Sequence, residues 1–482
     1  WRFNPEKDAL NYGLTDDQCD AAFPGLFQEV DRAREHFKDR KIQEKDVRIG
    51  AGEEDIPNSR SEFHAMIYNG QVRKIFQYTK GEPDRSRGLA ALASLHRAMN
   101  AIPNPRELPN IEFVLDLHDR GEAGSPDKIR WAWARHKTNQ NMWVVPDFDG
   151  WSYPDDAVGS YTQFRDDVRE MEVPFDIKIP RLAWRGSLGV NGRLRKALVK
   201  ASENHTWSDV KSIDWRTRNN VIPMQDFCKY KFVAHTEGEF VWIVDFGLKL
   251  TIAGNTWSGR LRYLHNCNSV PVIHELDWVA HYYPLLRSEG SRQNYVHVER
   301  DFSDLPAVMD DLVSRPDYAR AVAAESVATF RDRYLTPAAE ACYWRRLIHG
   351  WASVQDFKPR LYEYDGEVET EVVQGETVRK GDGRRRRGMS WERYAFRTGH
   401  SNEHGFIEGG AEECKAPKKE EEDSKSSSIS FGSGLSHLLW GSDDKSSDAD
   451  EEKQPKTELK EAVKTPPSTQ PQKGWMAWGR RE

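Results

Sequence analysis

Residues 179–200 restrict the fold of this chain most, because a buried strand there runs through a glycine-containing turn into a helix. The apolar and aromatic start of the stretch predicts the strand, and Asn191 is a suitable N-cap for the helix. Glycines let a backbone approach an anion, and the free N–H groups of a helix start point at it. Ser187 and Arg193 are therefore candidate phosphate ligands. The alternative is an ordinary strand-to-helix turn with a solvated arginine.

The second half of the chain continues this alternation of strand and helix. The expected elements are strands at residues 228–236, 269–274 and 295–298 and helices at 258–264 and 305–312. Such alternation is typical of a doubly wound parallel sheet, which gives an α/β fold class. Ser258 is a possible N-cap, and it would place Arg260 and Arg262 in the first turns of their helix.

The first half begins with helices and then turns to strands. We expect a helical lead-in at 1–46, a hairpin around Asn69 and Gly70 at 61–78, a helix at 88–99 and a short buried strand at 111–119. Asp116, His118 and Asp119 stand at the carboxyl end of that strand, where ligands bind in open α/β sheets. A carboxylate there could be a general base. A polar strand-end turn and a metal site built from these three side chains remain open.

Asp147 and Asp149 have the DxD spacing that binds a divalent metal and a nucleotide sugar in some transferases. They lie in an aromatic loop after a strand that is expected near residue 142. Such triplets are frequent by chance, so we interpret this one as an ordinary turn.

Composition excludes few functions. A net charge of −7 gives no sign of nucleic-acid binding, and five cysteines without a CxxC pair argue against a zinc site. The sequence contains no run of about eighteen apolar residues, so it predicts no membrane span in the stretch given. The chain begins with Trp1, and we expect a signal or anchor segment to precede it.

The character of the sequence changes near residue 366. Residues 384–387 are all arginine, and residues 413–473 are rich in Lys, Glu, Ser and Pro. We interpret 366–482 as a mostly disordered tail and the basic run as a solvated stretch without a partner.

Several motifs follow one another in order over residues 15–350. They are LDLHD at 115–119, WRGS at 184–187 with Arg193 six residues after the serine, CKYKF at 228–232, HTEG at 235–238, NTWSGRLRYLHNCNSVPVIH at 255–274 and ACYW at 341–344. Together they resemble glycosyltransferase family 90, which includes fungal capsule-associated xylosyltransferases and animal protein O-glucosyltransferases.

The resemblance implies a GT-B fold, in which two Rossmann-like domains face a cleft. The implied parts are an acceptor-side domain at 1–172, a UDP-sugar domain at 173–333, a helix returning to the first domain at 334–365 and the tail at 366–482.

The resemblance also implies an activity, the inverting transfer of a sugar from a UDP donor to a hydroxyl of a glycan or glycoprotein. No metal or other cofactor is expected. Asp119 falls on the catalytic aspartate of the family and would act as the general base. Ser187, Arg193, Gly238 and Arg260 fall at the nucleotide, where arginines and helix N-termini would balance the diphosphate leaving group.

The cysteines and the compartment follow from the same resemblance. It pairs Cys19 with Cys342 and Cys228 with Cys267, and it leaves Cys414 over. Two disulfides imply an oxidising lumen. Because the chain ends without a KDEL-type signal, we expect a type II membrane protein of the Golgi, with the ER lumen or secretion as alternatives.

Residues 239–254 depart from the family pattern, in which HTEG runs almost directly into NTWSGR. The inserted EFVWIVDFGLKLTIAG is too apolar for a surface loop. Codons for its start can contain a GTGAGT splice donor, so we hypothesise a retained in-frame intron. A genuine extra hairpin is the alternative.

Two other functions remain open. The first is a catalytically inactive carbohydrate-binding or scaffold member of the same fold, because the insert could disturb the donor site. The second is a metal-dependent hydrolase using Asp116, His118 and Asp119. The sequence does not separate glucose from xylose as the donor sugar, while a nearer resemblance to the fungal members favours a cell-surface glycan as acceptor.

Overall fold

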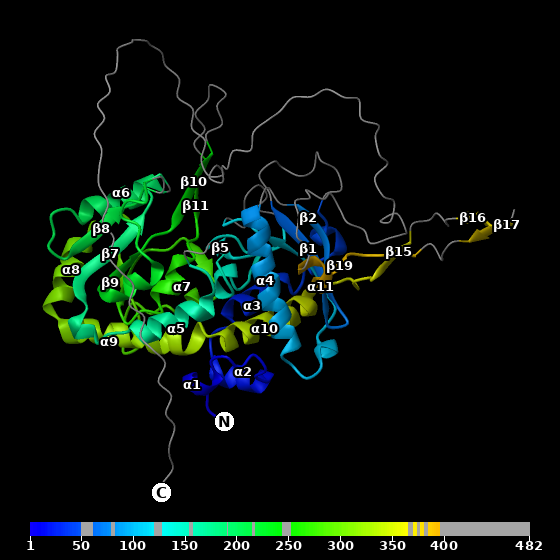
Figure 1. Cartoon of the computed structure of the whole chain (residues 1–482), viewed down its shortest axis with the longest axis horizontal. Coiled ribbons are helices and arrows are strands. Elements are labelled where there is room, and N and C mark those ends of the chain that lie inside the picture. Colours follow the sequence, from blue (N-terminus) through cyan, green and yellow to red (C-terminus); the bar gives the residue numbers. More distant parts are fainter. Residues whose placement is uncertain are drawn as a thin grey trace, which may run out of the picture. The chain divides into compact units, whose positions relative to one another are not determined.

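The computed structural model gives a mixed α/β fold with two large sheets (Figure 1). The structure describes residues 1–49, 61–78, 82–119, 128–153, 158–189, 191–214, 217–242, 252–364, 370–373, 376–379 and 384–395. Among these residues, none of the helices combines the length and apolar character that crossing a bilayer requires.

The helical lead-in is confirmed. It contains α1 (Pro5–Asp8), α2 (Asp16–Ala22), α3 (Gln28–Phe37) and the short 3-10 helix η1 (Glu44–Val47). Thr15 begins α2 with a capping box, since its hydroxyl accepts from the Gln18 N–H and the Gln18 side chain accepts in return. The apolar residues Phe23 and Val30 are buried in the core around the first sheet.

The first sheet is mixed. Its strands are β1 (Glu62–Tyr68), β2 (Gln71–Tyr78), β3 (Ile111–Asp116), β4 (Arg130–Ala132), β6 (Met142–Val144) and β19 (Met389–Ser390), in the order β19-β2-β1-β3-β4-β6. The predicted hairpin is confirmed, with Asn69 and Gly70 in the left-handed region at φ 48° and 73°. A two-residue turn joins only antiparallel strands, so this part departs from the parallel Rossmann-like sheet that the resemblance implied.

The second sheet is parallel throughout, as the alternation predicted. It consists of β7 (Ile179–Gly186), β8 (Ser208–Ser212), β9 (Tyr230–His235), β12 (Val270–His274) and β14 (Val296–Val298), in the order β14-β12-β9-β7-β8. Neighbouring residues of β7 enter different cores, Trp184 on one face and Ala183 on the other. A sheet buried on both faces explains the nearly continuous apolar strands.

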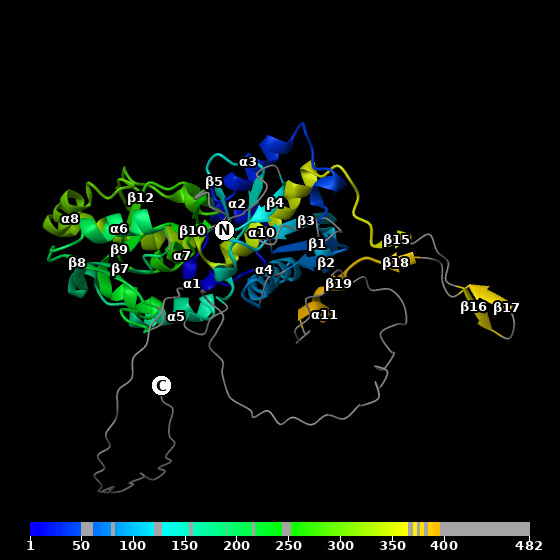
Figure 2. The ribbon, with the colours of Figure 1, turned by 90° about the horizontal axis from the view of Figure 1, so that it is seen from above.

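Helices cover these sheets. They are α4 (Glu82–Asn100), α5 (Tyr161–Met171), α6 (Gly192–Ala201), α7 (Arg260–Leu264), α8 (Leu305–Ser314), α9 (Pro316–Ser326), η8 (Val327–Tyr334) and α10 (Pro337–Val354). The predicted final helix is α10, which packs against α3 and α4 (Figure 2). The N-cap of α7 is Gly259 and not Ser258, because the chain turns into the helix one residue later than expected.

Both implied disulfides are confirmed. Cys19–Cys342 joins α2 to α10, and Cys228–Cys267 joins the segment before β9 to the segment after α7. Cys414 lies outside the described residues.

A small sheet connects the two halves of the chain. β5 (Ala134–His136) pairs antiparallel with β13 (Trp278–Ala280), and Lys137 lies 2.8 Å from Asp277 in an ion pair. The residues of β13 thus find a strand partner far away in the sequence, and the short helix η7 (Tyr283–Leu285) follows them.

The two ends of the insert pair with each other. β10 (Gly238–Trp242) and β11 (Ile252–Thr256) form an antiparallel ladder. Residues 243–251 lie outside the described residues. The pairing is what the extra-hairpin alternative requires, while the intron hypothesis concerns the transcript and stays a prediction.

Part of the segment interpreted as tail is ordered. β15 (Tyr362–Tyr364) pairs with β18 (Arg384–Arg386), β16 (Thr370–Val373) pairs with β17 (Glu376–Arg379), and β19 with α11 (Trp391–Ala395) packs on β2. The solvated interpretation of the basic run was wrong at Arg387, since a buried carboxylate of the first sheet binds it. Residues 396–482 lie outside the described residues, so disorder there remains a prediction.

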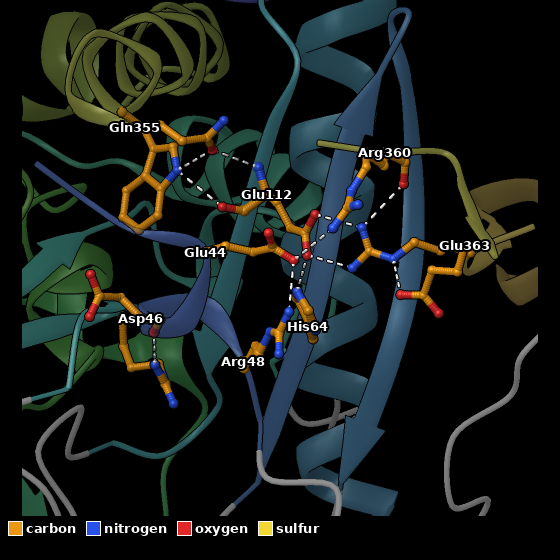
Figure 3. Close-up of polar contacts among 11 residues, drawn as sticks. Glu44, Asp46, Arg48, His64, Glu112, Gln355, Arg360 and Glu363 are labelled. Carbon is orange, nitrogen blue, oxygen red and sulfur yellow. Dashed lines mark hydrogen bonds and ion pairs between the residues drawn. The ribbon is translucent and has the colours of Figure 1, made fainter. Parts of the chain in front are cut away.

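That carboxylate is Glu112 of β3 (Figure 3). Its Oε1 accepts from Arg387 Nη2 at 2.7 Å and lies 2.8 Å from His64 Nε2, and its Oε2 accepts from Arg387 Nη1 at 3.0 Å. Burial alone would raise the pKa of Glu112, but the hydrogen bonds from His64 and Arg387 lower it to about 2. Glu112 therefore fastens residues 384–395 to the sheet.

Replacing Glu112 by Gln should lower the free energy of unfolding at neutral pH by about 1.5–3 kcal/mol, because bonds to a charged group are lost. The pKa of Glu112 is about 2 in the folded protein and 4.5 ordinarily. The stabilisation by this carboxylate is therefore complete above pH 4.5 and is lost as the pH falls toward 2. Urea unfolding at a series of pH values would measure it. Glu203→Gln, at an exposed site, is the control. If the loss in free energy of unfolding of Glu112→Gln did not change with pH, the ionised state of Glu112 would be contradicted.

Candidate functional site

The predicted phosphate loop follows β7. Asn191 adopts a left-handed conformation at φ 45°, and its side chain accepts from Leu194 N at 3.3 Å to begin α6. The same side chain donates to the carbonyl of Gly238 at 3.4 Å. Ser187 Oγ accepts from Gly189 N at 3.3 Å within the loop. The structure thus places Gly238 beside the turn that carries Ser187, next to the N-terminus of α6.

The helix presents two arginines in different directions. Arg193 is exposed, whereas Arg195 is half-buried and donates to the carbonyl of Ser187 at 2.9 Å. Two residues correspond to about 200° around a helix, so these side chains cannot share a direction. Sequence reasoning chose Arg193 and missed Arg195. The sequence did offer a signal for Arg195, since it is a second basic residue two positions after Arg193.

Arg195 and Arg260 are two neighbouring cations at the carboxyl end of β7. Burial, and then the charge of Arg260, lower the pKa of Arg195 to about 10, and burial lowers the pKa of Arg260 to about 10. Arg260 donates to the carbonyl of Arg185. In the described part of the chain, neither guanidinium has a carboxylate partner. The pair is therefore positive charge that an anionic ligand could balance.

His235 ends β9 near these arginines. Its ring is buried and stacks on His274 with 6.3 Å between centroids, and neither ring nitrogen has a hydrogen-bond partner among the described residues. Burial, reinforced by His274 and Arg260, holds the pKa of His235 well below its usual value, so the imidazole is neutral. Sequence reasoning missed this residue, although HTEG stood at the end of a predicted strand.

Asp119 lies just past the end of β3, and its side chain is 44% exposed. Its Oδ1 accepts from Arg87 Nη1 of α4 at 3.1 Å. Arg87 also lies 5.0 Å from the ring centroid of Phe148, and Asp119 is the main cause that raises the pKa of this arginine. The predicted base is therefore held by an arginine that sequence reasoning missed.

The metal alternative at this strand end finds no support in the geometry. Asp116 is buried and accepts from the backbone N–H of His118 at 2.9 Å, while Asp119 turns to Arg87. Across the described ranges, no three or more His, Cys, Asp or Glu side chains are grouped so as to hold a metal ion.

A buried network around Arg262 lies next to Arg260 in the sequence. Arg262 Nε is 3.0 Å from Asp147 Oδ1, and its Nη1 donates to Glu340 Oε2 at 3.0 Å. Glu340 Oε1 accepts from Ser94 of α4 at 2.6 Å. Burial alone would lower the pKa of Arg262, but Asp147 and Glu340 raise it well above the usual value. Arg262 thus joins α4, α7 and α10.

The DxD triplet is a turn, as interpreted, but a buried one. Asp147 caps the short 3-10 helix η4 (Phe148–Gly150), and Asp149 accepts from the Tyr263 hydroxyl at 3.1 Å. Burial, and then the charge of Asp147, raise the pKa of Asp149 to about 8, so this carboxyl is protonated at neutral pH. A Cβ on Gly259 would lie 2.0 Å from Asp149 Oδ2, which is why α7 can begin there only with glycine.

The segment from Asp147 to Tyr153 lies near both parts of the candidate site. Tyr153 lies close enough to both Arg87 and Arg260 to raise the pKa of each, against the effect of burial. Tyr153 is therefore near both Arg87, which holds Asp119, and Arg260.

These features define an α/β protein with two arginines that lack carboxylate partners among the described residues, at the carboxyl end of a parallel strand, and with a separate exposed carboxylate. The sequence model of Glycosyl transferase family 90 matches residues 24–399, and the chain belongs to this family. Protein O-glucosyltransferase 1 of Rattus norvegicus is 24% identical over 271 residues, 50% of this chain and 62% of the relative. Protein O-glucosyltransferase 1 of Homo sapiens is 23% identical over 269 residues, with the same shares. The chain spans about 62% of the length of these curated relatives.

Replacing Arg262 by Met should lower the free energy of unfolding by about 3–5 kcal/mol, because Asp147 and Glu340 would remain buried without a cation. Urea unfolding at neutral pH measures the loss. At mildly acidic pH the deficit should be smaller, since the stranded carboxylates can then take up protons. Arg106→Met, at an exposed position, is the matched control, and equal unfolding midpoints for the two variants would refute the network's role.

Proposed function

We propose that the protein is an inverting glycosyltransferase that moves xylose or glucose from a UDP donor to a hydroxyl of a glycan or glycoprotein. One observation carries the proposal. An exposed carboxylate, Asp119, is oriented by Arg87, and two cations without carboxylate partners among the described residues, Arg195 and Arg260, bind carbonyls at the carboxyl end of β7. Family membership and the names of the two relatives support the same reaction type.

In the proposed step, Asp119 takes the proton of the acceptor hydroxyl while that oxygen attacks the anomeric carbon of the donor sugar. The new carbon–oxygen bond forms as the bond to the diphosphate breaks, and UDP leaves with the electron pair. Attack opposite the leaving group inverts the anomeric centre. Arg87 positions the carboxylate for this proton transfer.

The leaving diphosphate needs positive charge, and the chain supplies it without a metal in this proposal. Arg260 and Arg195 would face the phosphates, with the N-terminus of α6 and the backbone at Ser187 and Gly238 completing the site. Arg193 is exposed on the first turn of α6, where it could reach only the outer part of a bound nucleotide.

The proposal includes the GT-B architecture and the Golgi location. The first sheet with α10 against it would form the acceptor domain (1–172 with 334–365), and the parallel sheet would form the donor domain (173–333). The two disulfides support an oxidising compartment, as expected for a lumenal enzyme.

The test is UDP release from UDP-xylose and UDP-glucose with EDTA present. Asp119→Asn should lower kcat by about 10²–10⁴-fold and leave UDP binding intact, since the base acts only in the chemical step. Arg260→Ala should instead weaken UDP binding. Asp17→Asn, at an exposed helix start, is the control. Full activity of Asp119→Asn would remove the proposed base.

A second form without residues 239–254 separates the remaining alternatives. Activity only in the shortened form would support the intron hypothesis, and activity in the full chain would make the hairpin a working element. If neither form releases UDP from either donor, UDP binding measured by thermal shift distinguishes an inactive sugar-binding member from an enzyme for another donor.

A further inference from the structure

A groove of about 430 Å³ lies along the C-terminal half of α4, on residues that no step of the proposed reaction uses. We name it the α4 groove. Its distinctive lining is aromatic and polar together, and it consists of Tyr12, His96, Arg97, Asn100, Trp151 and Trp391. These residues come from four separate parts of the chain: the turn before α2, α4 itself, the segment after η4, and α11.

The side chains of the α4 groove hold one another in place. The guanidinium carbon of Arg97 lies 4.8 Å from the ring centroid of Tyr12 and 4.7 Å from that of Trp151, and its Nη1 donates to the Tyr12 hydroxyl at 2.9 Å. The ring of Trp391 lies 5.7 Å from that of His96. The aromatic rings are thus fixed before any ligand arrives, which limits the ordering cost of binding.

The polar groups beside the rings retain capacity for a ligand. Asn100 Nδ2 lies 2.9 Å from His96 Nε2, while its carbonyl oxygen faces no donor in the described part of the chain. Neither Trp151 nor Trp391 has a hydrogen-bond partner for its indole N–H among the described residues. Flat apolar rings with hydrogen-bonding groups at their margins match a pyranose, which has C–H groups on its faces and hydroxyls around its rim.

The position of the α4 groove relative to Asp119 indicates which kind of ligand it would bind. Arg87, which holds Asp119, and Arg97, which holds Trp151, lie ten residues apart on α4, a rise of about 15 Å. Trp151 follows η4, whose Phe148 ring lies under Arg87. The α4 groove and the arginine that holds the carboxylate therefore lie on one helix, at a distance that a chain of a few sugar units can span.

We propose that the α4 groove binds pyranose units of the acceptor glycan remote from the hydroxyl that reacts at Asp119. This inference rests on the proposed function and names its acceptor as a saccharide chain and not a bare polypeptide. Binding there would hold the acceptor while Asp119 engages its terminal hydroxyl, so long acceptors gain over short ones.

The experiment measures binding of cellohexaose, mannohexaose and xylohexaose to the full chain by isothermal titration calorimetry. At least one should bind, and Trp151→Ala and Trp391→Ala should each weaken it by about tenfold, since an aromatic contact is worth up to about 1.5 kcal/mol. Asn100→Ala, at an exposed site, should weaken it as well. Trp1→Ala removes a tryptophan that is 60% exposed outside the groove and is the matched control.

The outcomes separate the groove from the reaction. UDP binding and UDP release without acceptor should be the same in the Trp391 and Trp1 variants. Loss of hexasaccharide binding only in the groove variants supports the α4 groove even if no UDP-sugar turns over, in which case the proposed function fails alone. The groove proposal is overturned if the unaltered chain binds none of the three sugars, or if the groove variants bind them as tightly as Trp1→Ala does.

Discussion

The buried guanidinium of Arg262 is the interaction on which the rest of the site depends. Two acidic side chains, Asp147 and Glu340, bind it in a place that water does not reach, burial raises the pKa of both, and Asp149 beside them remains protonated. Removing any one charge from such a group leaves another unbalanced at high cost. The network therefore fixes how α7 lies against α4 and α10. Arg260 is on the same short helix, so its position at the edge of the second sheet follows from the same network.

Arg262 and Arg260 differ in their partners, and this difference distinguishes an arginine with a structural role from one that could bind a ligand. Arg262 is paired with acidic side chains within the protein, whereas Arg260 and Arg195 donate hydrogen bonds only to carbonyls among the described residues. Two like charges held together without an anion are unfavourable, and burial adds to this. A bound anion would offset this unfavourable repulsion between Arg195 and Arg260. His235 is compatible with this because it stays neutral and adds no third positive charge.

Local patterns predicted the fold well and the site only in part. Short apolar runs found the parallel strands, and helical spacing with a capping residue found the helix that begins at Asn191, since these patterns depend on neighbouring residues. The resemblance added both disulfides, which are confirmed, while the roles it gives Asp119 and Arg260 stay predictions. Arg87 and Arg262 escaped prediction because their roles come from partners far away in the sequence. The choice of Arg193 over Arg195 shows a further limit, since motif spacing does not say which way a helical side chain points once the helix has packed.

In the segment after α10, a contact between residues far apart in the sequence helps to form the α4 groove. Its basic and polar composition predicts disorder, and composition carries no information about the one carboxylate, Glu112, that is buried in the first sheet and binds Arg387. That ion pair places β19 beside β2, and α11 then brings Trp391 onto His96 of α4. One wall of the α4 groove is thus supplied by residues that a sequence-based boundary would remove as tail. Loosening the Glu112 pair would open the groove without touching Asp119, so that acceptor binding and chemistry depend on different parts of the chain.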